Sequence, residues 1–213
     1  MIKGLILDMD GLILDTEKLY NTFWKAACSD FGFHLDEPEA LSLRSLSGDN
    51  AKKRFLDLFG EEFDYKAVRA HRIELMDKYI EQNGVDIKPG AEDFLSYAKK
   101  KGYKISTATT SPLLRTENVL KLSGLDIYFD ELVCGDMVSK SKPAPDIYLL
   151  AAKKLGLDVS ECFGFEDSPN GVNAIVAAGM KAVMIPDLSE PDDEIKKKLF
   201  ALRKNLFDAK DLL

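Results

Sequence analysis

Apolar positions after about residue 88 alternate between helical spacing and short apolar runs. The runs have the length of a strand and are bounded by Gly, Pro, Asp or Ser, whereas the segments between them repeat their apolar positions every three to four residues. Strands are predicted at residues 3–8, 103–109, 131–134, 162–166 and 181–185. Because strands alternate with helices along the chain, the pattern predicts an α/β fold built on a parallel sheet.

Glycine follows each helix that is predicted between these strands. The helices are expected at residues 90–101, 146–155 and 168–178, and the glycines are Gly102, Gly156 and Gly179. Glycine adopts a positive φ without strain, which is what the chain needs just beyond a helix end. From Asp192 onward the charges have the pattern of a solvated helix, which is predicted to continue through residues 199–202.

Residues 16–84 show helical periodicity without a convincing strand. Amphipathic stretches occupy residues 16–31, 50–59 and 65–82. We therefore predict an all-helical domain at residues 16–84, inserted after the first strand of an α/β core made of residues 1–15 and 85–213. Residues 83–90 return the chain to the core and are predicted to pair with residues 15–17 as a two-stranded hinge.

Composition and charge narrow the classes of function. The chain has 213 residues, of which 46% are hydrophobic, so it can bury a sizeable core without disulfides. It carries 29 Lys and Arg against 36 Asp and Glu, a net charge of −7, which repels nucleic acid and acidic membrane surfaces. The two histidines, His34 and His71, have no neighbours suited to a Ser-His-Asp hydrolase.

The cysteines and the N-terminal sequence predict where the protein works. Cys28, Cys134 and Cys162 are widely spaced and form no C-x-x-C pair, so a reducing environment is expected. The apolar run before Asp8 is far shorter than a signal-sequence core or a membrane helix. We expect a cytoplasmic monomer that binds neither nucleic acid nor a membrane.

The first predicted strand ends in two aspartates, Asp8 and Asp10, which are followed by Gly11. Open parallel sheets bind ligands beyond the carboxyl ends of their strands, and glycine permits an abrupt turn there. Two carboxylates at this spacing can face one pocket, where one attacks as a nucleophile and the other transfers protons. An Asp-x-Asp-Gly segment also occurs in calcium loops, but the further oxygen ligands of such a loop are absent here.

Three later segments place reactive groups at strand ends or helix starts. One strand ends in a run of hydroxyl residues, which could cap the next helix or bind an anion; they are Thr109, Thr110 and Ser111. Lys142 lies in a loop that two prolines stiffen, so its charge is held in place. Glu166 and Asp167 follow an apolar strand and offer hard oxygen ligands suited to Mg²⁺.

Together, these four segments resemble those of the haloacid dehalogenase superfamily, specifically its phosphatase and β-phosphoglucomutase-like branch. The motifs occur in the family's order over nearly the whole chain, at residues 8–16, 109–111, 141–146 and 166–168. The resemblance implies a Rossmann-like three-layer α/β core with a parallel sheet and a helical cap inserted after the first strand. It also implies Mg²⁺-dependent hydrolysis of a small phosphorylated metabolite, such as a sugar phosphate.

The same resemblance implies a role for each reactive residue. Asp8 would form an aspartyl-phosphate, and Asp10 would serve as general acid and then as general base. Thr109 and Lys142 would hold the phosphoryl oxygens. The Mg²⁺ ligands would be Asp8, the Asp10 carbonyl, Glu166 and Asp167. Candidate contacts to the remainder of the substrate are Thr110, Ser111, Thr16, Tyr20 and Arg44.

Two other classes share part of this pattern. A two-component receiver domain also carries a phosphorylated aspartate on a parallel sheet, but its acidic pair comes first, whereas Glu166 and Asp167 come last. Dehalogenases of the same superfamily lack the second aspartate and the metal-binding acids, so Asp10 and the acidic pair weigh against that class. Every reactive position of the family's pattern is filled in this sequence, which a catalytically silent scaffold would not need.

A β-phosphoglucomutase-like isomerase is the alternative to a phosphatase. The family's mutases hold a second phosphate with a histidine on the first cap helix and an arginine in the next cap segment. Tyr20 and Gly48 occupy these positions here, and Arg44 is near enough in the sequence to replace the arginine. A tyrosine does not exchange protons near neutral pH as a histidine does, so the sequence favours a phosphatase. The other polar cap residues, expected mostly at the surface, are Arg69, His71 and Arg72.

Overall fold

The computed structural model describes residues 1–43, 48–187 and 190–213. The chain forms two compact units, an α/β unit of residues 1–15 and 85–213 and a helical unit of residues 16–84. Within the described residues, each helix is too short or too polar to cross a membrane.

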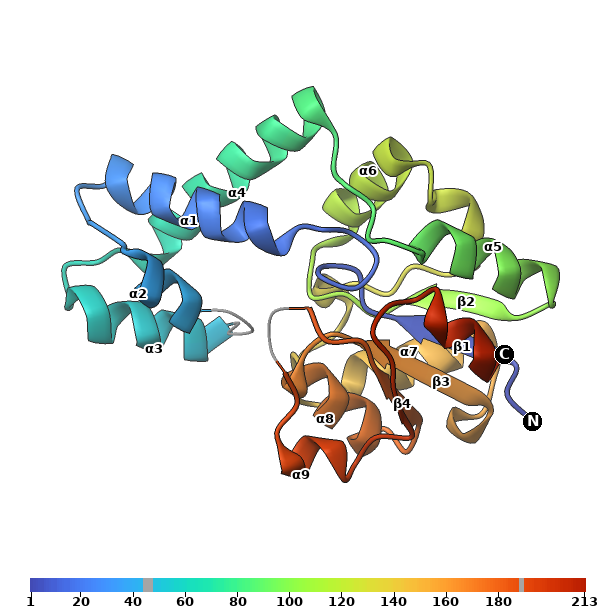
Figure 1. The fold of residues 1–213 in the computed structure, drawn as a ribbon. Helices are drawn as coiled ribbons and strands as arrows, with labels where there is room; N and C mark the ends of the chain where they lie inside the picture. Colours follow the sequence, from blue (N-terminus) through green and yellow to red (C-terminus); the bar gives the residue numbers. More distant parts are fainter. Residues whose placement is uncertain (44–47, 188–189) are drawn as a thin grey trace. The chain divides into compact units, whose positions relative to one another are not determined.

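The α/β unit is built on a sheet of five parallel strands (Figure 1). The strands are β1 (Gly4–Leu7), β2 (Lys104–Thr107), β3 (Cys162–Glu166), β4 (Lys181–Met184) and β5 (Ala201–Leu202), in the order β2-β1-β3-β4-β5. The chain adds β2 on one side of β1 and later adds β3 on the other side. The carboxyl ends of β1 and β3 are therefore the topological switch point, where such sheets bind ligands.

Helices cover both faces of this sheet, which confirms the predicted three-layer α/β architecture (Figure 1). On one face, α7 (Asp146–Leu155) and α8 (Pro169–Ala177) bury their apolar sides against the strands. On the other face, α5 (Ala91–Lys100) brings Phe94 to 5.1 Å from Phe165 of β3. The remaining helices are α6 (Leu113–Ser123) and α9 (Asp193–Lys196), and 3₁₀ turns lie at Asp126–Tyr128, Gly135–Met137, Val159–Glu161 and Asp208–Leu212.

Glycine decides how closely α8 packs on the sheet. A Cβ added to Gly164 of β3 would lie 2.6 Å from the Ile175 side chain of α8, so a larger residue would push the helix away. Ser168 begins α8 by accepting a hydrogen bond from the Gly171 N–H, and Pro169 takes the first helical position. The glycines predicted to end three helices have the expected positive φ at 83°, 68° and 79°, and they are Gly102, Gly156 and Gly179.

The strand predicted at residues 131–134 is wrong. This segment lies beside β2 but makes only isolated parallel bridges to it. The hydroxyl of Thr107 accepts a hydrogen bond from the Val133 N–H at 2.9 Å, so a side chain replaces the backbone acceptor that a regular ladder needs. The chain then enters a 3₁₀ turn at Gly135–Met137.

The helix predicted through residues 199–202 is also wrong. The helix α9 ends at Lys196, and Ala201–Leu202 instead form β5, which extends the sheet beside β4. The Phe200 N–H donates to the Ala182 carbonyl at 2.8 Å, and its ring lies 5.1 Å from that of Phe163. Pairing with β4 therefore outweighs the helical charge pattern.

The helical unit consists of α1 (Glu17–Asp30), α2 (Glu37–Ser42), α3 (Gly48–Phe59) and α4 (Tyr65–Asn83) (Figure 1). The sequence predicts all of these except α2, which is too short to show helical periodicity. Aromatic rings fill the core: Phe55 stacks on Phe63 with ring centroids 5.1 Å apart, and Trp24 lies 4.5 Å from Phe55. Trp24 thus contributes to the core of this unit.

The predicted two-stranded hinge is a single antiparallel bridge between Leu14 and Ile87. The Asp15 N–H donates to the Asp86 carbonyl, and the Lys88 N–H donates to the Ile13 carbonyl, each at 2.8 Å. The pairing is shorter than predicted and begins before residue 15, because α1 starts at Glu17 and Pro89 has no N–H to donate.

Candidate active site

The turn after β1 fixes the positions of Asp8 and Asp10. The Asp8 N–H donates to the Phe165 carbonyl at 3.0 Å, which extends the pairing with β3 by one residue. Gly11 then reverses the chain with a φ of 88°, and its N–H donates to the Leu14 carbonyl at 2.9 Å. Asp8 is therefore held at the carboxyl edge of the sheet, where it is 7% exposed.

Lys142 lies between two buried carboxylates. Its Nζ donates to Asp8 Oδ1 and to Glu166 Oε1, each at 2.5 Å. Burial disfavours the ammonium group, but the two carboxylates outweigh it and raise the pKa of Lys142 well above its ordinary value. Lys142 is therefore a fixed positive charge in contact with Asp8.

Glu166 is held by five donors. Its Oε1 accepts from Lys142 and from the Tyr148 hydroxyl at 3.2 Å. Its Oε2 accepts from the Asp167 N–H, the Ser168 N–H and the Ser168 hydroxyl at 2.9 to 3.0 Å. Gly171 makes room for this carboxylate, because an added Cβ there would lie 1.8 Å from Glu166 Cδ. Burial alone would raise the pKa of Glu166, but Lys142 and the Ser168 donors lower it below its ordinary value.

Asp8 has the opposite electrostatic balance. Burial raises the pKa of Asp8 to about 8, and the charges of Glu166 and Asp10 add to this rise, which Lys142 opposes only in part. Asp8, Glu166 and Asp10 together bring more carboxyl groups to this place than the single ammonium of Lys142 can pair with. A bound cation would favour the Asp8 carboxylate, because it compensates this excess.

The acidic residues at the ends of β1 and β3 fit a divalent metal. One oxygen each from Asp8, Glu166 and Asp167 lies within 4.8 Å of the others. Carboxylate oxygens are the ligands that Mg²⁺ prefers, and Glu166 and Asp10 add negative charge around Asp8. The site therefore suits Mg²⁺ by both its chemistry and its charge.

We expect the metal-free protein to lose stability as the pH rises from about 4 to about 8 because of Asp8. Its folded-state pKa of about 8 lies above its ordinary value of 3.8, so the native state retains a proton that the unfolded chain has released. This contribution is complete below the ordinary pKa and is lost as the pH rises through the folded-state pKa.

Asp8→Asn cannot titrate, so it isolates this contribution. In EDTA, the Tm of Asp8→Asn should exceed that of the wild type by an amount that grows between about pH 5 and pH 8. Saturating Mg²⁺ should stabilise the wild type and reduce the difference. Thermal melts of both proteins across this range measure the effect, and a difference independent of pH would contradict the raised pKa of Asp8.

Three groups of the α/β unit surround the Asp10 carboxylate. The Ser111 hydroxyl donates to Asp10 Oδ2 at 3.0 Å, and the Thr109 hydroxyl lies 3.4 Å from the same oxygen. Arg115 of α6 places its Nη1 at 2.8 Å from Ser111 Oγ and at 3.7 Å from Asp10 Oδ1. Two hydroxyls predicted to bind the phosphoryl group or the substrate, those of Thr109 and Ser111, thus contact Asp10 in this structure. Thr110, the third residue of this run, is exposed.

Sequence reasoning missed two residues of this group, Arg115 and Tyr148. Arg115 lies in the first turn of α6, whereas Ser111 precedes that helix, so no helical spacing relates the two residues. An arginine in an amphipathic helix is usually solvated, so the sequence did not single it out. Tyr148 is fully buried on the apolar face of α7, where a tyrosine is most simply interpreted as core.

The predicted cap residues belong to the helical unit, whereas the group around Asp8 is built from the α/β unit. Thr16 is buried directly before α1, and Arg44 lies outside the described residues. Tyr20 faces Arg72, whose guanidinium carbon lies 4.8 Å from the ring centroid. Arg72 is 6% exposed and is thus an exception to the expectation that most polar cap residues lie at the surface. The rings of Tyr20 and Trp24 accept its charge in an apolar setting.

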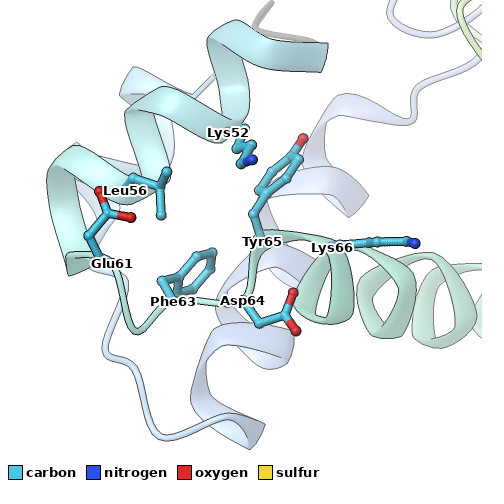
Figure 2. A pocket seen from close by; sticks show the side chains of 7 residues that line it. All are labelled: Lys52, Leu56, Glu61, Phe63, Asp64, Tyr65 and Lys66. Carbon is cyan, nitrogen blue, oxygen red and sulfur yellow. The ribbon is translucent and has the colours of Figure 1, made fainter.

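A pocket of about 470 Å³ lies in the helical unit, between α3 and the start of α4 (Figure 2). It is lined by Lys52, Leu56, Glu61, Phe63, Asp64, Tyr65 and Lys66. Among the described residues, those predicted to act on a substrate do not line this pocket. Two lysines and two acidic residues give it no excess of either charge, so it has no clear preference for an anion or a cation.

The family is decided by a match between residues 2–179 and the model of the haloacid dehalogenase-like hydrolase family. The chain belongs to this family. The match covers the Asp8 turn, the helical unit, Lys142 and the acidic pair after β3. In this haloacid dehalogenase-like hydrolase, the predicted site residues therefore lie within the part of the chain that matches the family.

Known relatives include both phosphatases and a mutase. The chain is 31% identical to fructose-1-phosphate phosphatase YqaB of Escherichia coli over 84% of this chain and 94% of that protein. It is similar to CbbY of Rhodobacter sphaeroides in complex with phosphate, at 25% identity and a TM-score of 0.87, with both chains fully covered. It is also similar to β-phosphoglucomutase of Clostridium difficile, at 26% identity and a TM-score of 0.81 over 98% of this chain and 93% of that chain.

Proposed function

We propose that this hydrolase is a Mg²⁺-dependent phosphatase that acts on small phosphorylated metabolites through an aspartyl-phosphate at Asp8. The observation that carries the proposal is the placement of Asp8 in contact with Lys142, beside Glu166 and Asp167 and two residues before Asp10. A nucleophile, a fixed cation, a set of metal ligands and a proton-transfer group are the parts that phosphoryl transfer needs.

In the first step, an Asp8 oxygen attacks phosphorus and the bond from phosphorus to the ester oxygen breaks. Asp10 donates a proton to the leaving oxygen, which departs as an alcohol. In the second step, Asp10 takes a proton from a water molecule, whose oxygen attacks phosphorus. The bond from phosphorus to Asp8 then breaks, inorganic phosphate leaves, and Asp8 is regenerated as a carboxylate.

The surrounding residues hold the reacting groups in place. Lys142 neutralises charge on the transferred phosphoryl group, and Glu166 fixes the lysine from its other side. The Thr109 hydroxyl, which lies 3.4 Å from Asp10 Oδ2, can exchange this contact for one with a phosphoryl oxygen. Mg²⁺, held by Asp8, Glu166, Asp167 and the Asp10 carbonyl, would supply positive charge against the developing negative charge.

One relative supports a phosphorylated sugar or a similar metabolite as the substrate, because YqaB is a fructose-1-phosphate phosphatase. The proposed roles of the α/β residues concern only the phosphoryl group, which all such substrates share. Selectivity is therefore assigned to the cap, with Thr16, Tyr20 and Arg44 as candidate contacts together with Thr110.

The three cysteines are buried and unpaired, which supports a reducing, cytoplasmic setting, and we propose that the chain works as a monomer.

A phosphosugar mutase is the second candidate, because β-phosphoglucomutase of Clostridium difficile shares the fold over nearly the whole chain. A mutase must hold a second phosphate while it returns the phosphoryl group to another hydroxyl. Tyr20 stands where the family's mutases carry a histidine, and its ring faces Arg72. Gly48 offers no charge for a second phosphate, so hydrolysis is favoured.

Phosphorus NMR on β-glucose 1-phosphate, primed with the bisphosphate and Mg²⁺, distinguishes these two functions. We expect inorganic phosphate to accumulate steadily and glucose 6-phosphate to remain a minor product. Release of phosphate from fructose 1-phosphate under the same conditions would extend the result to a second sugar phosphate. Clean conversion to glucose 6-phosphate with little free phosphate would overturn the phosphatase proposal.

A further inference from the structure

The guanidinium group of Arg115 lies inside the α/β unit beside the proposed proton-transfer residue. Arg115 is 8% exposed and projects from the first turn of α6. Its Nη1 donates to Ser111 Oγ at 2.8 Å, and the same hydroxyl donates to Asp10 Oδ2 at 3.0 Å. A chain of two hydrogen bonds therefore connects Arg115 to one Asp10 oxygen, and the guanidinium nitrogen lies 3.7 Å from the other.

We propose that Arg115 is a positioning residue that orients the Asp10 carboxylate for proton transfer, through Ser111 and by its own charge. The inference rests on the proposed role of Asp10 as general acid and base. Arg115 does not itself touch the reacting atoms in this proposal. It acts on the direction in which Asp10 points.

The geometry explains why an arginine is suited to this task. The guanidinium is planar and always charged, so it keeps both the donor to Ser111 and the charge beside Asp10 in one rigid group. Both side chains are nearly excluded from water, at 8% exposure for Arg115 and 12% for Asp10, so the attraction is weakly screened. The distance of 3.7 Å is longer than a hydrogen bond, and Ser111 therefore provides the directional contact.

The position of Asp10 explains why such support is needed. Asp10 lies on the turn that Gly11 makes after β1, beyond the last residue of regular strand pairing. The Asp10 side chain has several staggered rotamers, and only some of them direct an oxygen at the leaving group. Because α6 packs within the α/β unit, Arg115 ties Asp10 to a regular element of the fold.

The test compares two phosphate esters that need different help from a general acid. The first is fructose 1-phosphate, whose alkoxide leaves only with a proton, and the second is 2,4-dinitrophenyl phosphate, whose leaving group departs without one. We expect Arg115→Gln to lower kcat/KM for fructose 1-phosphate by about 30-fold and for dinitrophenyl phosphate by less than about threefold. Arg115→Lys keeps the charge and should recover to within about fivefold of the wild type on fructose 1-phosphate.

Further variants separate positioning from folding and from the proposed function itself. Arg115→Met keeps apolar volume in the buried site and carries the same expectation if Arg115→Gln does not fold. Arg203→Gln, which removes a surface ion pair with Asp211, is the matched control and should leave both kcat/KM values unchanged. Equal losses on the two esters, or no loss on either, would overturn the role of Arg115. Asp10→Asn should lose more kcat/KM on fructose 1-phosphate than on dinitrophenyl phosphate. Equal losses for this variant would overturn the role of Asp10 as general acid, and the proposed mechanism with it.

Discussion

Asp8→Asn is expected to lower phosphate release by at least about 10⁴-fold, because an amide nitrogen cannot form the aspartyl-phosphate and the substitution also removes a metal ligand. Steady-state release of phosphate from fructose 1-phosphate with saturating Mg²⁺ measures the loss. EDTA should reduce the wild-type rate to a similar level. Asp193→Asn is the control, since its side chain is 92% exposed, and it should retain full activity.

The same variant should stay folded, so loss of activity reports on the chemistry. The asparagine side chain has nearly the volume of the aspartate that it replaces, and the Lys142 ammonium keeps its contact with Glu166. Circular dichroism and thermal melts check the fold. Acid-quenched wild-type protein should carry one phosphoryl group by intact mass during turnover, whereas Asp8→Asn should carry none. Turnover of the variant at near the wild-type rate would exclude Asp8 as the nucleophile.

The strands β1 to β4 could be predicted from the sequence, whereas the two-residue edge strand β5 could not. Residues 162–165 carry no polar side chain because β3 is buried on both faces between β1 and β4, and the predicted and observed bounds of this strand agree. At the edge, β5 has only two residues, and its pairing depends on β4 and on Phe163. The strand predicted at residues 131–134 does not form a regular ladder, because the Thr107 hydroxyl accepts the hydrogen bond of the Val133 N–H in place of a backbone carbonyl.

The candidate site residues also differ in how far the sequence predicts them. Asp8 and Glu166 lie at the carboxyl ends of neighbouring parallel strands, so their meeting could be predicted. Lys142 lies in a loop that two prolines stiffen, and it contacts both carboxylates. Arg115 and Tyr148 reach the site from helices. Their contacts depend on how α6 and α7 pack against the sheet, which no local spacing determines. The raised pKa of Asp8 also depends on burial and on the sum of neighbouring charges, which exist only in the folded protein.

Asp167→Asn and Glu166→Gln are expected to weaken Mg²⁺ binding alike but to differ in folding stability. Substitution of groups behind metal ligands already costs about 10 to 100-fold in affinity, so removal of a direct ligand should cost at least about 30-fold. Titration calorimetry with Mg²⁺ alone measures this without reference to activity. Asp193→Asn should bind Mg²⁺ as the wild type does, because that residue lies in the exposed first turn of α9.

The two variants should differ in their free energy of unfolding, because Glu166 also accepts hydrogen bonds that hold neighbouring groups in place. Its carboxylate accepts from Lys142, Tyr148 and the start of α8, and it is 1% exposed. Glu166→Gln would remove the negative charge facing Lys142 and place an amide donor against existing donors, which we expect to lower the free energy of unfolding by about 3 kcal/mol in EDTA. Asp167→Asn should change it by less than about 1 kcal/mol, since the Asp167 backbone N–H to Glu166 is retained. Urea unfolding of both variants in EDTA provides the comparison. If Glu166→Gln kept both its stability and its Mg²⁺ affinity, Glu166 would be neither a metal ligand nor the anchor of Lys142, and the charge of the site would have to be balanced by another group.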